Sequence, residues 1–197
     1  MSTLNLTREL ERLIADIAGG MAEFSHIDPQ RLLVCIATTR SGGIHGTYAK
    51  IHPLRFEDGS RTKIVTRRRQ RYSLEMPAIV QRSTEMLYVI YFLVPRFLEL
   101  STREKLITVF HELYHISPDF NGDIRRFPGR NYAHGSSTRR YNALMSELVD
   151  RYLDKLDNQN VPDFLHGGME ELRSRHTAIV GRKLPAPRIT IKKVSST

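Results

Sequence analysis

The feature that most constrains the fold is an apolar segment followed closely by a well-capped helix. The segment MLYVIYFLV, residues 86–94, is rich in β-branched and aromatic side chains and predicts a buried strand. Ser101 and Glu104 form an S-T-R-E capping box, which is typical of a helix N-terminus. We therefore expect a helix over residues 102–116, which ends there because Pro118 cannot continue it.

Hydrophobic patterns elsewhere predict further helices over 6–18 and 138–156, and strands over 31–39, 47–56 and 62–66. The last two strands are expected to pair, with Pro53 placing the first of them at a sheet edge. The charged run RRRQRYS is expected to be a solvated loop, with a contact to phosphate as the alternative. This order predicts an α+β domain in which a small mixed or antiparallel sheet packs against the capped helix and further helices. We expect the domain to span residues 1–157, and a basic, partly ordered extension to span 158–197.

Composition narrows the class of protein and its partners. Of the 197 residues, 40% are apolar and 26% are charged, which is typical of a globular protein. The net charge of +9 favours acidic partners, of which nucleic acid is the commonest. The single cysteine, Cys35, excludes a four-cysteine zinc site and is expected to be a buried thiol. The polar N-terminus and the short apolar runs predict a cytoplasmic protein with no membrane partner.

The capped helix carries a His-Glu-x-x-His run, HELYH, at residues 111–115. Residues four apart lie one turn apart on the same helix face, so His111 and His115 can bind one cation. Glu112 projects beside them, where it can accept a proton from a water that the metal has acidified. This combination is typical of zinc peptidases. It predicts Zn²⁺ as the cofactor and a peptide bond as the substrate.

A catalytic zinc ion takes a third protein ligand and leaves one position for water. One known pattern needs Gly three residues after the second histidine and another His three further on. Those positions hold Pro118 and Asn121, so that pattern fails. The best candidate is His134, which precedes a glycine and a new helix. Glu147 on that helix is the second candidate, and His166, in FLHGG, is the third.

Other side chains near the motif have more than one interpretation. A donor for the developing oxyanion could come from any of three tyrosines, although tyrosines at such positions are more often packing residues: Tyr114, Tyr132 and Tyr141. Three arginines between the candidate ligands could bind an acidic substrate or nucleic acid, or be solvated: Arg125, Arg126 and Arg130. The basic run TRRRQRY supports an alternative to the enzyme, a nucleic-acid-associated binding protein with a structural or inactive metal site.

The order strand, capped helix with HELYH, loop and AHG before another helix resembles the zincin metallopeptidases. Within them it is similar to the SprT-like group and most similar to the phage metallopeptidase domain family. The segments HELYHISPDFNGDIRR and AHG carry the resemblance, which covers residues 85–155 well. It implies a zincin-like fold, zinc bound by His111, His115 and His134, and Glu112 as general base. It also implies a protein or peptide substrate and, if the protein is viral, the host cytoplasm.

Overall fold

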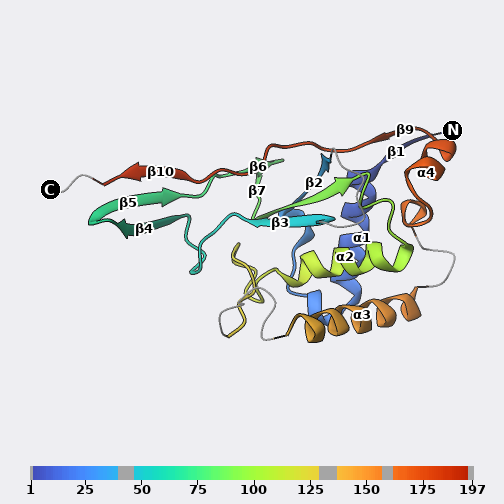
Figure 1. Cartoon of the computed structure of the whole chain (residues 1–197), viewed down its shortest axis with the longest axis horizontal. Coiled ribbons are helices and arrows are strands. Elements are labelled where there is room, and N and C mark those ends of the chain that lie inside the picture. Colours follow the sequence, from blue (N-terminus) through green and yellow to red (C-terminus); the bar gives the residue numbers. More distant parts are fainter. Residues whose placement is uncertain (1, 40–46, 129–136, 157–161, 195–197) are drawn as a thin grey trace.

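The computed structural model describes residues 2–39, 47–128, 137–156 and 162–194 (Figure 1). Its helices are α1 (Leu6–Gly20), α2 (Thr102–Tyr114), α3 (Thr138–Lys155) and α4 (Met169–Arg175), with short 3-10 turns at Ala22–Phe24, Pro29–Arg31 and Asp163–Leu165. Its strands are β1 (Ser2–Asn5), β2 (Leu32–Thr38), β3 (Ala49–Pro53), β4 (Thr62–Arg67), β5 (Gln70–Glu75), β6 (Val80–Gln81), β7 (Thr84–Glu85), β8 (Tyr88–Val94), β9 (His176–Val180) and β10 (Thr190–Lys193). Helices combined with small sheets confirm the expected α+β class.

The central sheet has the order β2-β8-β3, and β8 lies in the middle. It is parallel to β2 and antiparallel to β3, so this sheet is mixed. The apolar run that predicted β8 is buried almost throughout, as expected for a central strand. β3 is an edge strand and ends at Pro53, which confirms the interpretation of that proline.

Helices cover the sheet in two layers. Figure 1 shows α2 between the sheet and α3. The amphipathic helix predicted over 6–18 is α1, whose buried face includes Leu10, Ile14 and Ile17. The packed aromatic rings of Phe24 and Phe110, 5.2 Å apart, join the segment after α1 to α2. The core that results holds α2 rigidly against β3.

Two expectations about the basic region were wrong. Segment 62–66 does not pair with residues 47–56, because β4 pairs with β5 in an antiparallel hairpin. The run RRRQRYS is not a loop, since it forms the turn of that hairpin and most of β5. The turn residues Arg68 and Arg69 have φ of 50° and 64°, a conformation usually taken by Gly, Asn or Asp. The usual sequence signal of a two-residue hairpin is therefore absent.

The segment after residue 162 wraps back over the earlier part of the chain. β9 pairs in parallel with β1, and β10 adds a third strand to the hairpin. The buried Lys105 on α2 donates to the backbone carbonyls of Phe164, Leu165 and Gly167 at 3.3, 3.1 and 2.7 Å. The domain boundary at residue 157 stays a prediction. None of the described helices is long and apolar enough to cross a membrane.

Candidate metal centre

The candidate site is built on α2, and its N-terminal cap determines where the helix begins. Ser101 Oγ accepts a hydrogen bond from the Glu104 amide at 3.3 Å, and Glu104 Oε2 accepts one from the Ser101 amide at 2.9 Å. This is the predicted capping box. The helix then buries Leu106, Val109 and Phe110 in the core. The side opposite this apolar stripe carries the histidines.

The two histidines of the motif lie together, one helical turn apart. The ring centroids of His111 and His115 are 4.7 Å apart, and the rings are inclined at 79°. Glu112 is only 7% exposed. Burial raises the pKa of its carboxyl group to about 7, and a backbone hydrogen bond from Ile51 opposes this shift. A cation beside the carboxylate would also lower its pKa, because it favours the charged form.

These three side chains open into one groove beside β3. The groove has a volume of about 360 Å³ and is lined by His111, Glu112, His115 and Ile124, with the whole of β3 along one side. It therefore combines the candidate metal ligands and the candidate base with the edge of a sheet.

The edge of β3 that pairs with no other described strand faces this site. On the side toward β8, the Tyr48 carbonyl accepts a hydrogen bond from the Leu93 amide at 2.8 Å. Because bonded and non-bonded pairs alternate in an antiparallel ladder, Ala49 and Ile51 direct their backbone groups away from β8. The hydrogen bond from the Ile51 backbone to Glu112 agrees with this direction.

The loop after α2 fixes the position of His115. Tyr88, on the central strand, accepts a hydrogen bond from the Gly122 amide at 3.0 Å and donates to the Asp123 carbonyl at 2.8 Å. Gly122 has φ of 90°, and a Cβ there would lie 2.4 Å from Arg55 Cγ, so a side chain would strain the backbone and displace Arg55. The loop returns to the helix end, where the Arg125 amide donates to the His115 carbonyl at 2.6 Å.

The arginines of this loop that the structure describes are engaged in the fold. Arg125 Nε donates to the Tyr114 carbonyl at 2.8 Å, and its guanidinium lies 4.2 Å from the centroid of the Tyr114 ring. Arg126 forms two hydrogen bonds with the buried Asp123, at 2.9 and 3.0 Å. Both therefore support the loop. Arg130 lies outside the described residues.

Tyr141 of α3 packs against both histidines. Its ring centroid is 5.0 Å from that of His111 and 6.0 Å from that of His115. Its hydroxyl lies 3.4 Å from the His111 carbonyl. Burial raises the pKa of this hydroxyl, and the negative charge of Glu112 adds to the shift. The sequence placed Tyr141 near the motif, but only the tertiary packing of α3 on α2 gives it this contact.

The structure describes the first two candidate ligands but not the favoured third. His134 and the candidate donor Tyr132 lie outside the described residues. Glu147 is exposed on α3, and His166 is exposed after the turn Asp163–Leu165. Within the described ranges, no third His, Cys, Asp or Glu joins the pair in a group that could hold a metal ion. The described part of the chain thus gives no support to Glu147 or His166.

A comparison with protein families decides what kind of protein carries this arrangement. A model of the family described as "Putative phage metallopeptidase" matches residues 4–157. The chain belongs to this family. No curated protein and no solved structure was found to match it. The matched segment contains α1, the central sheet, α2 and α3, which are the elements that build the groove.

A phage metallopeptidase requires a metal ion, and the donors on α2 fit one. Two imidazoles one turn apart, with a buried carboxylate between them in sequence, suit a borderline metal such as zinc. Magnesium and calcium prefer sets of oxygen ligands, and the described groove supplies one carboxylate, that of Glu112. The chemistry of the side chains therefore agrees with the family.

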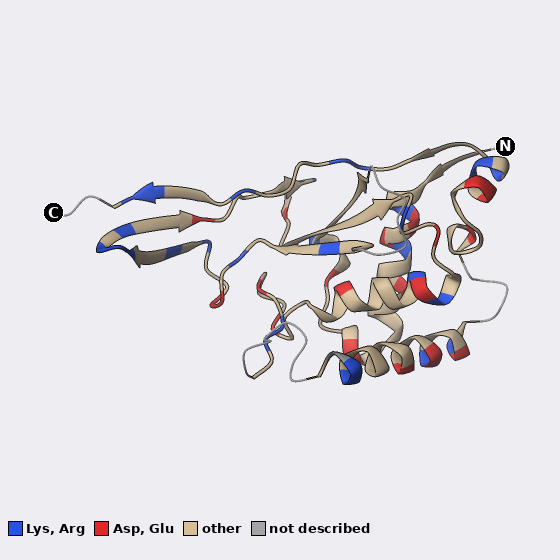
Figure 2. Ribbon diagram, viewed as in Figure 1, with Lys and Arg blue, Asp and Glu red and all other residues tan. Residues whose placement is uncertain are grey.

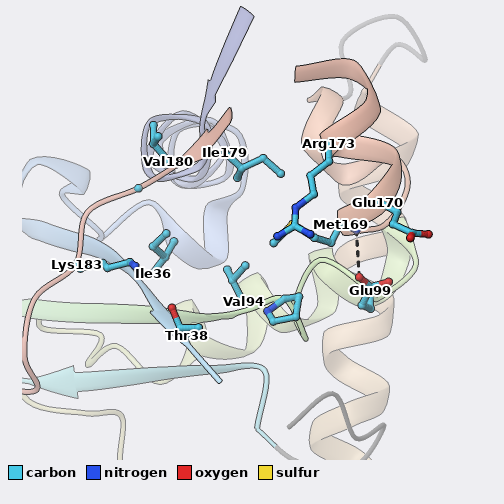
Figure 3. A pocket seen from close by; sticks show the side chains of 12 residues that line it. Ile36, Thr38, Val94, Glu99, Met169, Glu170, Arg173, Ile179, Val180 and Lys183 are labelled. Carbon is cyan, nitrogen blue, oxygen red and sulfur yellow. Dashed lines mark hydrogen bonds between the residues drawn. The ribbon is translucent and has the colours of Figure 1, made fainter. Parts of the chain in front are cut away.

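A larger cavity lies elsewhere in the structure, between β9, α4 and the ends of β2 and β8 (Figure 3). It has a volume of about 710 Å³. Its carboxylate Glu99 accepts a hydrogen bond from the Met169 amide at 3.1 Å, and Arg173 points into it. It is lined by no histidine or cysteine of the described chain. Volume alone does not identify the candidate site, because the histidines that could bind a metal line the smaller groove.

Proposed function

We propose that the protein is a zinc-dependent peptidase that hydrolyses peptide bonds in the groove between α2 and β3. The observation that carries this proposal is the pairing of the His111 and His115 rings, 4.7 Å apart, beside the buried Glu112. When bound, zinc lowers the pKa of a water toward about 7 and polarises the substrate carbonyl. His134 is proposed as the third ligand because of its resemblance to the third ligand of SprT-like peptidases.

Glu112 is the proposed general base. Its carboxylate accepts a proton from the attacking water and then delivers a proton to the leaving amine. The Ile51 backbone hydrogen bond holds the carboxylate in the groove and favours its charged form. Burial on the other sides excludes bulk water from the base.

The edge of β3 supports an extended peptide as the substrate. An incoming strand can pair with outward-directed backbone groups of a sheet edge, and Ala49 lies on this edge of β3, within the groove. Such pairing recognises the peptide backbone without requiring particular side chains. It would hold a scissile carbonyl alongside His111 and His115.

The test is the substitution Glu112→Gln in the full chain, assayed for zinc content and for hydrolysis of a peptide library. Gln keeps the shape of the side chain but cannot accept the proton, so hydrolysis should fall about 10²–10⁴-fold. Zinc content should stay near one ion per chain, because Glu112 is not a proposed ligand. A variant that hydrolyses as fast as the parent would rule out Glu112 as the base.

His111→Ala is the matched variant on the same helix. It removes a proposed ligand, so both zinc content and hydrolysis should be lost. If zinc-reconstituted parent protein binds no metal by elemental analysis, the zinc proposal is wrong, whatever the activity of the variants.

A further inference from the structure

The second feature of the molecule that calls for a function is the arm, which we define as β4, β5 and β10 with the turn Arg68–Arg69. Figure 1 shows that this three-stranded sheet extends away from the helices. Its 62–75 and 190–193 segments contain seven basic residues and one acidic residue, Glu75. The net charge of the whole chain is +9, so most of the excess positive charge lies on the arm (Figure 2).

Basic side chains occupy both faces of the arm and its tip. Because residues paired across strands share a face, the pairing of Lys193 with Tyr72 places both on the face that also carries Arg67. Thr66 pairs with Arg71, which places Arg71 on the opposite face. Arg68 and Arg69 form the turn between the strands. The positive charge therefore surrounds the end of the arm.

Most of these cations have no carboxylate partner in the described part of the chain. Lys63 and Lys192 form exposed ion pairs with Glu57 and Glu75 at 3.5 and 3.8 Å, and such pairs contribute little. The five others form no ion pair among the described residues and are all exposed: Arg67, Arg68, Arg69, Arg71 and Lys193. Unneutralised arginines in a row attract a polyanion, and guanidinium groups fit phosphate oxygens well.

The turn is costly for arginine. Arg68 and Arg69 both have positive φ, which costs non-glycine residues free energy relative to Gly or Asn. Arg82 and Ser83 adopt the same conformation in the β6–β7 turn, so strain by itself does not single out the tip. At the tip, however, the strained turn adds two cations to an already basic end. Arg68 and Arg69 are therefore better explained by the charges that they carry than by a preference of arginine for this turn.

The distribution of charge discriminates between polyanions. A flat anionic membrane would contact one face of the arm, whereas the walls of a duplex groove contact both faces and the tip. A single-stranded nucleic acid is bound chiefly by stacking on aromatic rings, and the arm has one, Tyr72. A second copy of the chain would bring two positive arms together. The double helix is therefore the partner that fits best.

We propose that the arm binds double-stranded DNA, with its tip in a groove and its arginines on the phosphates of both walls. The major groove is about 12 Å wide and admits a two-stranded ribbon. Among the described residues, β10 and Val194 accompany β5 as far as Arg71, whose carbonyl accepts a hydrogen bond from the Val194 amide at 3.0 Å. The end of the hairpin at residues 67–70 extends beyond this third strand and would enter the groove. The apolar hollow beside Tyr72 and Ile191, of about 580 Å³, is bordered by Arg67 and Arg68. The hollow therefore lies next to arginines that would bind the phosphate backbone of the DNA.

The test variant is Arg68→Asn/Arg69→Gly in the full chain. Asn-Gly is the preferred sequence for this turn, so the hairpin should stay folded while two cations are removed. Fluorescence anisotropy with a labelled DNA duplex should show binding weakened about tenfold or more. The slope of log affinity against log salt concentration should become shallower by about two.

Arg139→Gln/Arg140→Gln on α3 is the control, since it removes two adjacent exposed arginines from the body of the protein. It should leave duplex affinity within about twofold, and Glu112→Gln should leave it unchanged. The proposal is overturned if the tip variant binds duplex like the parent, or if the α3 variant loses as much. Equal or tighter binding of the parent to single-stranded DNA, duplex RNA or anionic vesicles also overturns it.

Discussion

The groove beside α2 differs from the arm in how far its side chains are buried. The groove rests on a packed core in which Phe110 and Ile90 are fully buried. On the arm, Ile64 and Ile191 are 55% and 64% exposed. A metal centre needs its ligands held within a fraction of an ångström, which only packed elements can do. Contact with phosphates depends on charge and reach, so long cationic side chains on a thin support are sufficient.

The largest expected effect comes from loosening the packing of Tyr141 against His111 and His115. Replacing Tyr141 with Leu removes the ring that contacts both imidazoles. Because groups that orient metal ligands control affinity, zinc affinity should fall about 10–100-fold. Competition with a chromophoric chelator measures this. Affinity for a DNA duplex should not change, because Tyr141 is not part of the arm.

Tyr141→Phe is the matched control, because it keeps the ring and removes only the hydroxyl that lies 3.4 Å from the His111 carbonyl. Zinc affinity should stay within about threefold of the parent, since a neutral hydrogen bond contributes about 1 kcal/mol or less. A loss of zinc affinity as large as that of Tyr141→Leu would contradict the positioning role of the ring. A large loss of hydrolysis with normal zinc affinity would assign the Tyr141 hydroxyl to the developing oxyanion.

The second prediction concerns the contact between α2 and the C-terminal segment that also supplies the arm with β10. Lys105→Met keeps the length of the side chain but removes the donor to the carbonyls of Phe164 and Gly167, whereas the Leu165 carbonyl keeps its hydrogen bond from the Thr102 hydroxyl at 2.9 Å. Buried acceptors without a partner destabilise, so unfolding by urea should require about 1–3 kcal/mol less. Burial lowers the pKa of Lys105, which means that burying its charged form costs free energy. The variant avoids this cost, so part of the loss is offset.

Arg103→Met provides the comparison on the same helix. Arg103 and Asp150 form an ion pair at 2.8 Å with both side chains about half exposed, and such pairs contribute about 0–1 kcal/mol. Lys105→Met should therefore be the more destabilising of the two. Under conditions where both variants are folded, their affinity for duplex DNA should equal that of the parent. Weaker DNA binding by Lys105→Met would indicate that the arm depends on this contact.

The sequence predicted the groove better than it predicted the arm. The capping box, the i, i+4 histidines and the apolar run of β8 are local signals, so α2 and its pair of histidines could be recognised from a few residues. The burial of Glu112 and the ring contacts of Tyr141 depend on how β3 and α3 pack on α2. No local pattern encodes that packing.

The arm was missed for two physical reasons. Its turn uses Arg68 and Arg69 where a recognisable hairpin would have Asn-Gly. Its third strand comes from the far end of the chain, since Thr190 pairs with Glu75. The parallel pairing of β1 with β9 is equally distant in sequence. A charged run was therefore taken for a solvated loop, and the contact with nucleic acid that its composition suggested stays a prediction.

The smallest expected effect is that of replacing an isoleucine of the arm with serine, and the same replacement in the core provides the comparison. Ile191→Ser, on the exposed β10, should change the free energy of unfolding by less than about 0.5 kcal/mol. Ile90→Ser, on the fully buried β8, should cost more than about 3 kcal/mol, because it removes core contacts and buries a hydroxyl. Urea unfolding of both variants measures this difference. If Ile191→Ser destabilises as much as Ile90→Ser, then β10 belongs to the cooperative core, and the arm is not the independent support that its exposure indicates. A small effect means instead that a side chain on the arm can change without unfolding the core that holds the groove.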